Sequence, residues 1–214
     1  MIPDLILALA MVTSATDPLT YLALGDSYTI GEGVADDARW PAVLARRLSS
    51  AGTAVAPPAI VARTGWTTDE LDAAIDRAAL DQRYDLVSLL IGVNNQYRRR
   101  EVEAYRGEFA DLLERAIGFA GGEPSRVFVL SIPDWGVTPF AEGRDRARIA
   151  RELDAYNEAA RAIAAARGVA FVDITPISRE DDADLAGDGL HPGAAQYARW
   201  AEAAEPVVAA LLGR

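Results

Sequence analysis

The sequence contains no cysteine and no lysine, and it has a single histidine, His191. Without cysteine, the chain can form no disulfide, no thiolate zinc site and no cysteine nucleophile. Without lysine, it can form no Schiff base, no Ser-Lys dyad and no phosphate-loop lysine contact. A single histidine also excludes metal sites built from several histidines. Catalysis near neutral pH is left with His191, a pair of carboxylates, or a metal held by oxygen ligands.

Basic charge is also scarce, because 21 arginines face 32 acidic residues and the net charge is −11. Such an acidic chain argues against nucleic acid and anionic membrane surfaces as partners. The chain has 214 residues, half of them hydrophobic, which is enough for one domain with a sizeable core.

The N-terminus allows two interpretations. Residues 5–12 form an apolar run followed by small residues, which resembles the end of a secretory signal. The start carries Asp4 and no basic residue, which favours a plain N-terminal extension, and the run is too short to span a bilayer. We assign residues 1–18 to an extension or signal remnant and residues 19–214 to a single domain. Both a cytoplasmic and an exported location stay open.

Short apolar runs alternate with segments of helical periodicity along the whole domain. The runs predict strands at residues 20–24, 59–62, 86–91, 127–132 and 169–174. The periodic segments predict helices at residues 40–49, 68–79, 101–119, 146–167 and 194–212. Continuously apolar strands are typical of a parallel sheet covered on both faces. The sequence therefore predicts a three-layer α/β/α sandwich.

Ligands of such sheets bind beyond the carboxyl ends of the strands, so polar residues that directly follow a strand are candidate site residues. Ser27 follows the first predicted strand, Gly65 the second and Asn94 the third. Asp188 and His191 lie between the fifth strand and the last helix. We expect these loops to meet at one edge of the sheet.

The chemistry of these side chains suggests a division of roles. The hydroxyl of Ser27 is a poor nucleophile until a base removes its proton, and His191 is the only side chain with an ordinary pKa near neutrality. Asp188 precedes His191 by three residues and could orient the imidazole. The backbone amides of Ser27 and Gly65 and the side chain of Asn94 are candidate donors to an oxyanion.

These motifs resemble those of the SGNH, or GDSL, hydrolases, which are named for a Ser, a Gly, an Asn and a His. The matching positions are Ser27, Gly65, Asn94 and His191, with Asp188 in the Asp-x-x-His pattern. The resemblance covers residues 20–212. It implies a flavodoxin-like sheet of order 2-1-3-4-5 and hydrolysis of esters or thioesters through an acyl-enzyme. We expect no cofactor and no metal, and a small-molecule ester as the partner.

Two positions depart from the family pattern. Tyr28 stands where the first motif usually has leucine, and Asn95 stands where the third motif usually has aspartate. The first change puts a larger ring beside Ser27, and the second removes a charge behind Asn94. Both leave the substrate preference open.

Other interpretations fit the sequence less well. The elbow of α/β-hydrolases needs glycine where Thr29 stands, and Asp36 breaks a dinucleotide-binding fingerprint. The acidic stretch 180–184 could bind calcium but lacks the spacing of an EF-hand loop. A binding module built on a hydrolase scaffold predicts the loss of Ser27 or His191, and both are present.

Some roles stay open at this stage. Asp26 is either a second functional acid or a local brace of the turn. Trp66 and Trp135 could line a pocket or belong to the core. An open cleft with little sequence to spare for a lid favours esters of short or medium acyl chains. Carbohydrate O-acetyl groups, thioesters and lysophospholipids are the alternatives. The candidate pocket residues are Tyr28, Trp66, Asn95, Tyr97 and Trp135.

Overall fold

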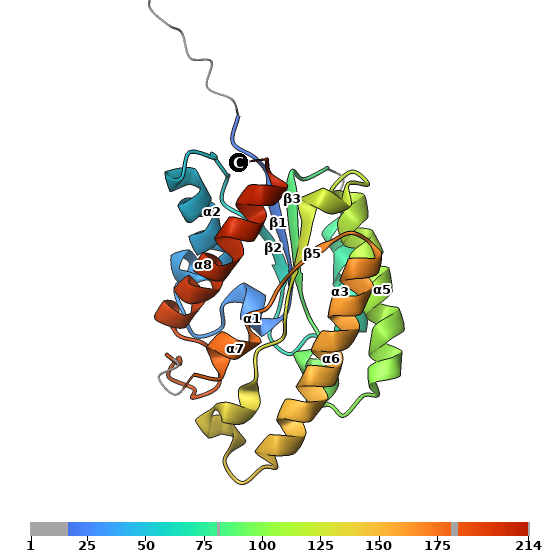
Figure 1. Ribbon diagram of the computed structural model, residues 1–214, viewed down its shortest axis with the longest axis vertical. Helices are drawn as coiled ribbons and strands as arrows, with labels where there is room; N and C mark the ends of the chain where they lie inside the picture. The colour runs from blue at the N-terminus through green and yellow to red at the C-terminus, as the bar shows by residue number, and fades with distance from the viewer. Residues whose placement is uncertain (1–16, 81, 181–183, 214) are drawn as a thin grey trace, which may run out of the picture.

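A computed structural model describes residues 17–80, 82–180 and 184–213. Its centre is a parallel sheet of five strands in the order β2-β1-β3-β4-β5 (Figure 1), as the resemblance implied. All five predicted strands are present; β2 has the predicted bounds, and the other four have shifted or shortened ends. They are β1 (Tyr21–Gly25), β2 (Ala59–Ala62), β3 (Leu86–Leu90), β4 (Val127–Leu130) and β5 (Ala170–Val172).

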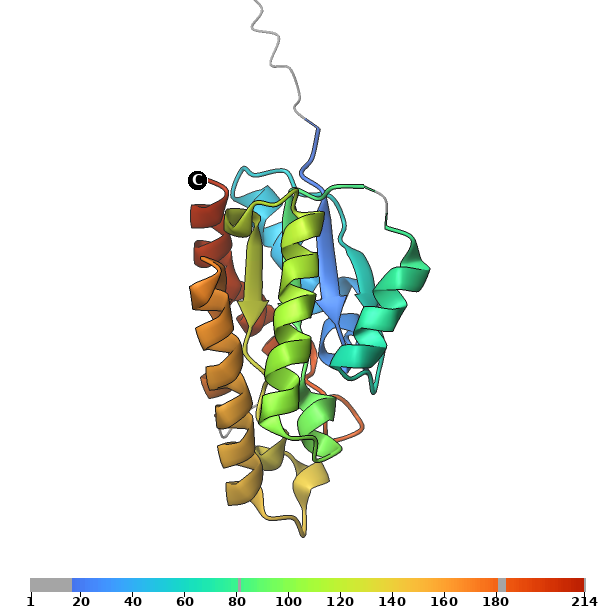
Figure 2. The same ribbon diagram turned by 90° about the vertical axis from the view of Figure 1, so that its right-hand side faces the viewer.

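Helices cover both faces of the sheet and complete the predicted three layers. One face carries α2 (Trp40–Ser50) and α8 (Ala194–Leu211), which pack against each other. The other face carries α3 (Thr68–Ala78), α5 (Val102–Phe119) and α6 (Arg146–Ala166), as Figures 1 and 2 show. These five helices are the ones that the sequence predicted.

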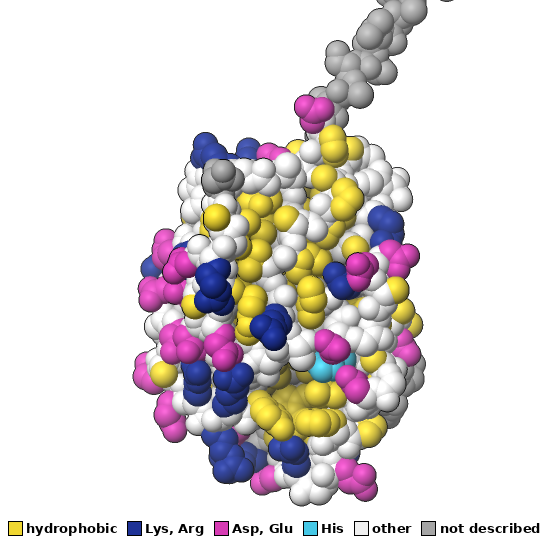
Figure 3. All heavy atoms as spheres, turned by 180° about the vertical axis from the view of Figure 1, so that it is seen from behind, with side chains coloured by type: hydrophobic (Ala, Val, Ile, Leu, Met, Phe, Trp, Pro, Cys, Tyr) yellow, Lys and Arg dark blue, Asp and Glu magenta, His cyan; other side chains and the backbone are white. Residues whose placement is uncertain are grey.

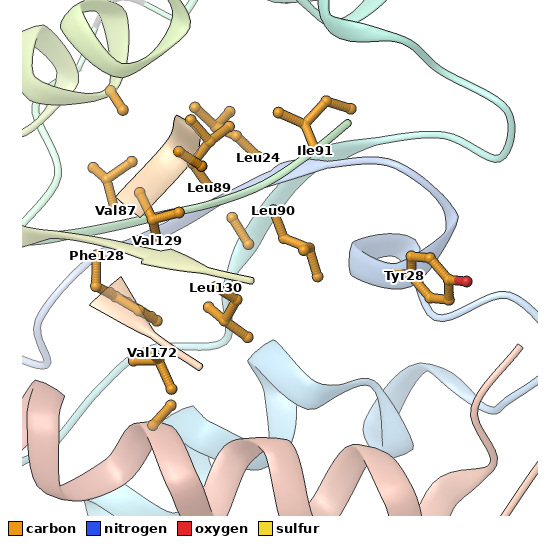
Figure 4. Packing of buried hydrophobic residues seen from close by; sticks show 14 of the residues in the cluster. Leu24, Tyr28, Val87, Leu89, Leu90, Ile91, Phe128, Val129, Leu130 and Val172 are labelled. Atoms are coloured by element: carbon orange, nitrogen blue, oxygen red, sulfur yellow. The ribbon is translucent and has the colours of Figure 1, made fainter. Parts of the chain in front are cut away.

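The core lies on both faces of the three central strands. Every residue of β1, β3 and β4 is buried, while the edge strands β2 and β5 are partly exposed. In Figure 4, Leu89 and Leu90 of β3 point to opposite faces of the sheet, as the two-residue period of a strand requires. Burial on both faces explains why these strands read as continuous apolar runs.

The helix ends follow their local sequence signals. The backbone N–H of Thr67 donates to Glu70 Oε2 at 2.9 Å, which closes a capping box at the start of α3. Gly121 and Gly168, with φ of +75° and +69°, follow the ends of α5 and α6. Left-handed backbone at these positions suits glycine and stops each helix.

Several short elements, which the sequence pattern did not predict, lie between the strands and the long helices. They are too short for a hydrophobic period to show. They are α1 (Ser27–Ile30), α4 (Val93–Tyr97), α7 (Thr175–Ser178) and the 3₁₀ turns Asp36–Ala38, Pro124–Arg126, Trp135–Val137 and Pro139–Ala141. Both α1 and α4 directly follow strands, at the carboxyl edge of the sheet.

Two features of the sequence fall outside the described residues, in whole or in part. The apolar run 5–12 does so entirely, and the acidic stretch 180–184 is described only at its two ends. Glu180 pairs with Arg199 at 2.7 Å, and Asp184 Oδ2 accepts a hydrogen bond from the backbone of Ala195 at 2.9 Å. These two acids therefore contact the first two turns of α8.

None of the helices in residues 17–80, 82–180 and 184–213 combines the length and the apolar character needed to cross a membrane.

Gly92, the residue before α4, is a position where the fold has no room for a side chain. Its φ is +128°, and a Cβ would lie 2.7 Å from Tyr105 Cε2 and 2.9 Å from Ile132 Cδ1. We expect Gly92→Ala to lower the free energy of unfolding by about 2–4 kcal/mol through steric overlap and backbone strain. Urea denaturation measures this.

Gly107 provides the matched control, because it lies exposed in α5 and a Cβ there meets no atom within 4 Å. Gly107→Ala should stabilise the protein by roughly 0.5–1 kcal/mol, since alanine is the better helix former. Equal stability of Gly92→Ala and the native protein would contradict the packing described at α4.

Candidate active site

The turn after β1 places Ser27 at the start of α1. Gly25 ends the strand, and a Cβ there would lie 2.4 Å from the carbonyl oxygen of Leu90 on β3. Asp26 is the N-cap residue, and its Oδ1 accepts a hydrogen bond from the backbone N–H of Tyr28 at 3.0 Å. The close approach of the backbones and this cap fix the direction in which Ser27 leaves the sheet.

The loop before α8 brings Asp188 and His191 together. Asp188 Oδ2 lies 2.6 Å from His191 Nδ1. Asp188 Oδ1 accepts hydrogen bonds from the backbone N–H groups of Leu190, at 2.9 Å, and His191, at 3.0 Å. One carboxylate therefore holds both the imidazole ring and the turn that carries it.

The environment of Asp188 favours its charged form. Partial burial works against the charge, but the hydrogen bonds from the His191 ring and from the two backbone amides outweigh it. As a result, the pKa of Asp188 lies below its usual value. An ionised Asp188 can stabilise a positive charge on the imidazole.

Ser27, Gly65, Asn94 and His191 line one cavity of about 170 Å3 at the carboxyl edge of the sheet. Loops that follow four different strands thus meet, as the sequence predicted. Figure 3 shows this hollow as a hydrophobic patch beside the histidine. The other residues that line the cavity are Tyr28, Thr64, Val93, Tyr97, Trp135, Phe140 and Leu190.

Gly65 lies in the loop between β2 and α3 with a φ of +89°, a conformation that favours glycine. A Cβ at this position would meet no atom within 4 Å, so the backbone borders open space. The carbonyl of Gly65 accepts a hydrogen bond from Arg98 Nη2 at 2.7 Å, and Arg98 pairs with Glu70 at 3.1 Å. This bridge links the loop to α3 through residues that do not line the cavity.

Three N–H groups remain as candidate donors to an oxyanion. Asn94 Nδ2 donates one hydrogen to the carbonyl of Trp66 at 2.9 Å, which orients the amide and leaves its second N–H. The backbone N–H groups of Ser27 and Gly65 donate no hydrogen bond to the part of the chain that the structure describes. All three residues border the cavity.

Tyr28, the first departure from the family pattern, packs against the histidine. The two ring centroids lie 5.7 Å apart at an interplanar angle of 61°, and Tyr28 is buried. Burial raises the pKa of the Tyr28 hydroxyl above its usual value. The uncharged Tyr28 ring therefore restricts the orientation of the His191 ring.

Asn95, the second departure, does not line the cavity. Its Oδ1 accepts the backbone N–H of Thr68 at 3.1 Å, and its Nδ2 donates to Thr68 Oγ1 at 2.6 Å and Glu108 Oε2 at 3.2 Å. An aspartate here could not donate these bonds and would face the carboxylate of Glu108. Asn95 thus joins α4 to α3 rather than contacting a ligand.

The structure also places Trp66 away from the cavity, packed against the hydrophobic core. Trp135 differs, because it is buried and also lines the cavity. Its Nε1 donates to Gln96 Oε1 at 2.8 Å, and Gln96 Nε2 donates to Glu152 Oε2 at 2.7 Å. A chain of hydrogen bonds from α6 therefore fixes the Trp135 ring.

The loop after β4 contributes two aromatic residues to the cavity, Trp135 and Phe140. Trp135 was among the predicted pocket residues, but Phe140 was not, and this loop was not among those predicted to meet at the edge of the sheet. The signal was present, since proline and aromatic residues directly follow an apolar strand in residues 133–140.

The comparison with protein-family models decides the family. The model of the GDSL-like lipase/acylhydrolase family matches residues 23–199. The chain belongs to this family. It is therefore a hydrolase of the esterase type and acts on carboxylic esters. The comparison with curated protein sequences gave no match.

Solved structures of GDSL hydrolases confirm the fold. TesA is 22% identical with a TM-score of 0.71, and the alignment covers 90% of this chain and 99% of TesA. The lipase/acylhydrolase from Enterococcus faecalis is 23% identical with a TM-score of 0.67, covering 88% and 94%. Axe2, an acetylxylan esterase from Geobacillus stearothermophilus, is 18% identical with a TM-score of 0.70, covering 89% and 94%.

Asp26 differs from Asp188 in being fully buried. Burial raises the pKa of Asp26 to about 7, against the opposing effect of backbone hydrogen bonds such as that from Tyr28. Its Oδ2 has no hydrogen-bond partner among the described residues. This acid braces the turn at Ser27 through one oxygen only.

The raised pKa makes the free energy of unfolding depend on pH. Between pH 3.8 and about 7, the folded protein holds the Asp26 proton more tightly than the unfolded chain does. The contribution of Asp26 to stability therefore falls as the pH rises through this window. Asp26→Asn keeps an acceptor for the Tyr28 amide but cannot ionise.

We expect the stability of Asp26→Asn relative to the native protein to increase between pH 4 and pH 7.5. Urea denaturation of both proteins at several pH values measures the difference, in which all other titrating groups cancel. A difference that stays constant across the window would contradict the raised pKa of Asp26.

Proposed function

We propose that the chain hydrolyses esters of short or medium acyl chains with Ser27 as nucleophile, His191 as base and Asp188 as the orienting acid. One observation carries the proposal: Ser27, Gly65, Asn94 and His191 line a single cavity, and Asp188 is bonded to His191 Nδ1. The bond to Nδ1 leaves Nε2 as the ring nitrogen that can accept a proton.

In the first half of the reaction, Ser27 Oγ attacks the ester carbonyl while His191 Nε2 takes the hydroxyl proton. The carbonyl oxygen becomes an oxyanion, which the N–H groups of Ser27, Gly65 and Asn94 stabilise. The bond to the alcohol then breaks, and His191 returns its proton to the alcohol as it leaves. Ser27 remains as an acyl ester.

In the second half, water attacks the acyl-enzyme and gives its proton to His191. The tetrahedral intermediate collapses, the carboxylic acid leaves, and Ser27 regains its proton. The Ser27 hydroxyl forms no hydrogen bond with the described residues. In the proposed mechanism Ser27 Oγ donates to His191 Nε2. Catalytic hydrogen bonds of this kind often tighten only when the substrate is bound.

The cavity supports small acyl groups. Its volume of about 170 Å3 is below the range of roughly 300–1,000 Å3 that is usual for sites holding drug-sized ligands. Aliphatic and aromatic side chains, including Val93, Leu190 and Phe140, supply most of its wall. Such a site accommodates a short apolar chain better than a long one.

Carbohydrate O-acetyl esters are the second candidate substrate. Tyr97 and Phe140 are 43% and 40% exposed at the edge of the cavity, and aromatic faces of this kind can stack on a sugar ring. The structural neighbour Axe2 is an acetylxylan esterase. Thioesters and lysophospholipids remain further alternatives without a supporting contact.

Ser27→Ala and His191→Ala should each lower kcat by about 10⁴–10⁶-fold with little change in KM, because each removes a member of one catalytic unit. Hydrolysis of 4-nitrophenyl butyrate measures the loss. A fluorophosphonate should label the native protein on Ser27 and leave Ser27→Ala unlabelled.

Ser50→Ala is the matched control, since Ser50 is exposed at the end of α2. It should keep the native rate and the labelling. Near-native activity of His191→Ala would overturn the proposed mechanism.

The preferred acyl length can be measured with 4-nitrophenyl esters of two to sixteen carbons, together with acetylated xylan. Because the cavity is small, kcat/KM should peak at or below about eight carbons and fall for longer chains. A peak at sixteen carbons would contradict the short-chain proposal. A much higher rate on acetylated xylan would favour the carbohydrate alternative.

A further inference from the structure

Three aromatic rings form the outer wall of the cavity. The ring centroids of Tyr97 and Trp135 lie 5.4 Å apart, those of Trp135 and Phe140 6.0 Å, and those of Tyr97 and Phe140 6.2 Å. Trp135 is buried, but Tyr97 and Phe140 are exposed. The rings come from α4 and from the loop after β4, so they join two separate segments into one surface.

Arg144 lies over all three of these rings. Its guanidinium carbon is 5.3 Å from the ring centroids of Tyr97 and Trp135 and 5.4 Å from that of Phe140. Arg144 Nη2 donates to the Tyr97 hydroxyl at 3.3 Å. Attraction to the ring faces holds the guanidinium in place while it stays exposed to solvent.

No acidic side chain in the described part of the chain pairs with Arg144. Within the described residues it forms no ion pair, and its remaining guanidinium N–H groups make no hydrogen bond. A guanidinium held against aromatic rings in this way keeps its remaining N–H groups free for a carboxylate or a phosphate. The Arg144 guanidinium is therefore already held in one place before an anion binds.

A polar groove of about 290 Å3 adjoins the cavity and shares Tyr97 and Trp135 with it. Arg144 lines this groove together with Arg99, Arg148, Asp145 and Glu152. In Figure 3, basic side chains border the hydrophobic patch next to the histidine.

The charges of this groove are only partly balanced. Arg148 pairs with Glu152 at 2.5 Å, and Asp145 Oδ1 accepts the backbone N–H of Arg148 at 2.9 Å. Arg99 and Arg144 form no ion pair within the described ranges. The groove therefore has a local excess of positive charge in a chain whose net charge is −11.

We propose that Arg144, packed against Tyr97, Trp135 and Phe140, is a subsite for an anionic group, a carboxylate or a phosphate, on the ester substrate. The substrate's ester group lies at Ser27, its apolar part crosses the aromatic wall, and its anionic end reaches the guanidinium. The inference rests on the proposed function and adds to it the charge of the preferred substrate.

Two matched pairs of esters test the subsite and locate the anion. The acyl pair is 4-nitrophenyl valerate and mono-4-nitrophenyl glutarate, which have acyl chains of equal length. The alcohol pair is phenyl acetate and 3-acetoxybenzoate. In each pair, the ratio of kcat/KM for the anionic ester to that for the neutral ester is compared between variants, so the intrinsic reactivity of each ester cancels.

Arg144→Gln should lower this ratio by about three- to tenfold in at least one pair, the range expected when a partly exposed, charge-assisted contact is lost. The change should lie mainly in the KM of the anionic ester. Arg144→Lys, which keeps the charge but not the planar donors, should give an intermediate ratio. Salt at 0.5 M should lower the native ratio through screening.

Arg151→Gln is the matched control. Arg151 lies exposed on α6, outside the residues that line the cavity and the groove, and the substitution removes the same charge. It should leave both ratios at their native values. If Arg151→Gln lowered the ratios as much as Arg144→Gln does, the effect would come from the net charge of the protein, and the proposed subsite would be wrong.

Unchanged ratios in Arg144→Gln for both pairs would also overturn the subsite while leaving the esterase proposal intact, provided that the neutral esters are hydrolysed. Hydrolysis that persists in Ser27→Ala would instead overturn the assignment of Ser27 as the nucleophile. Should Arg144→Gln fold poorly, the ratio in Arg144→Lys and its dependence on salt decide the question in the same way.

Discussion

The site depends on how closely the backbone can approach at the carboxyl ends of β1 and β3. A Cβ at Gly25 would lie 2.4 Å from the Leu90 carbonyl, and a Cβ at Gly92 would lie 2.7 Å from the Tyr105 ring. Both strands are buried throughout, so neither can move outward to make room. The two glycines therefore set where α1 and α4 begin, and with them the positions of Ser27 and Asn94.

The sequence was informative where a property extends over many residues. Burial on both faces of β1, β3 and β4 produced apolar runs that revealed the strands, and the helical period revealed the five long helices. The strand order came from the family resemblance instead. The meeting of four loops also followed from the sequence, because the carboxyl ends of parallel strands lie at one edge.

The sequence was less informative about the direction in which a single side chain points. Asn95 directly follows Asn94, yet it turns into a buried contact with Thr68 and Glu108 while Asn94 borders the cavity. That outcome depends on Glu108, a residue of another helix. Trp66 likewise follows Gly65 but packs against the core. Tertiary contacts determine these side-chain orientations, and the local sequence pattern carries no information about such contacts.

Two aspartates near the cavity show how the environment separates residues of the same type. Asp188 is 42% exposed and accepts hydrogen bonds from the His191 ring and from two backbone amides, which lower its pKa. Asp26 is fully buried, its Oδ1 accepts a hydrogen bond from the Tyr28 backbone N–H at 3.0 Å, and burial raises its pKa to about 7. The charge near the histidine is thus stable at neutral pH, whereas the charge next to Ser27 is not. A permanent negative charge beside Ser27 would oppose an oxyanion forming there. The buried position of Asp26 therefore suits a bracing role. The exposed position of Asp188, which keeps that carboxylate charged, suits the stabilisation of a charged imidazole.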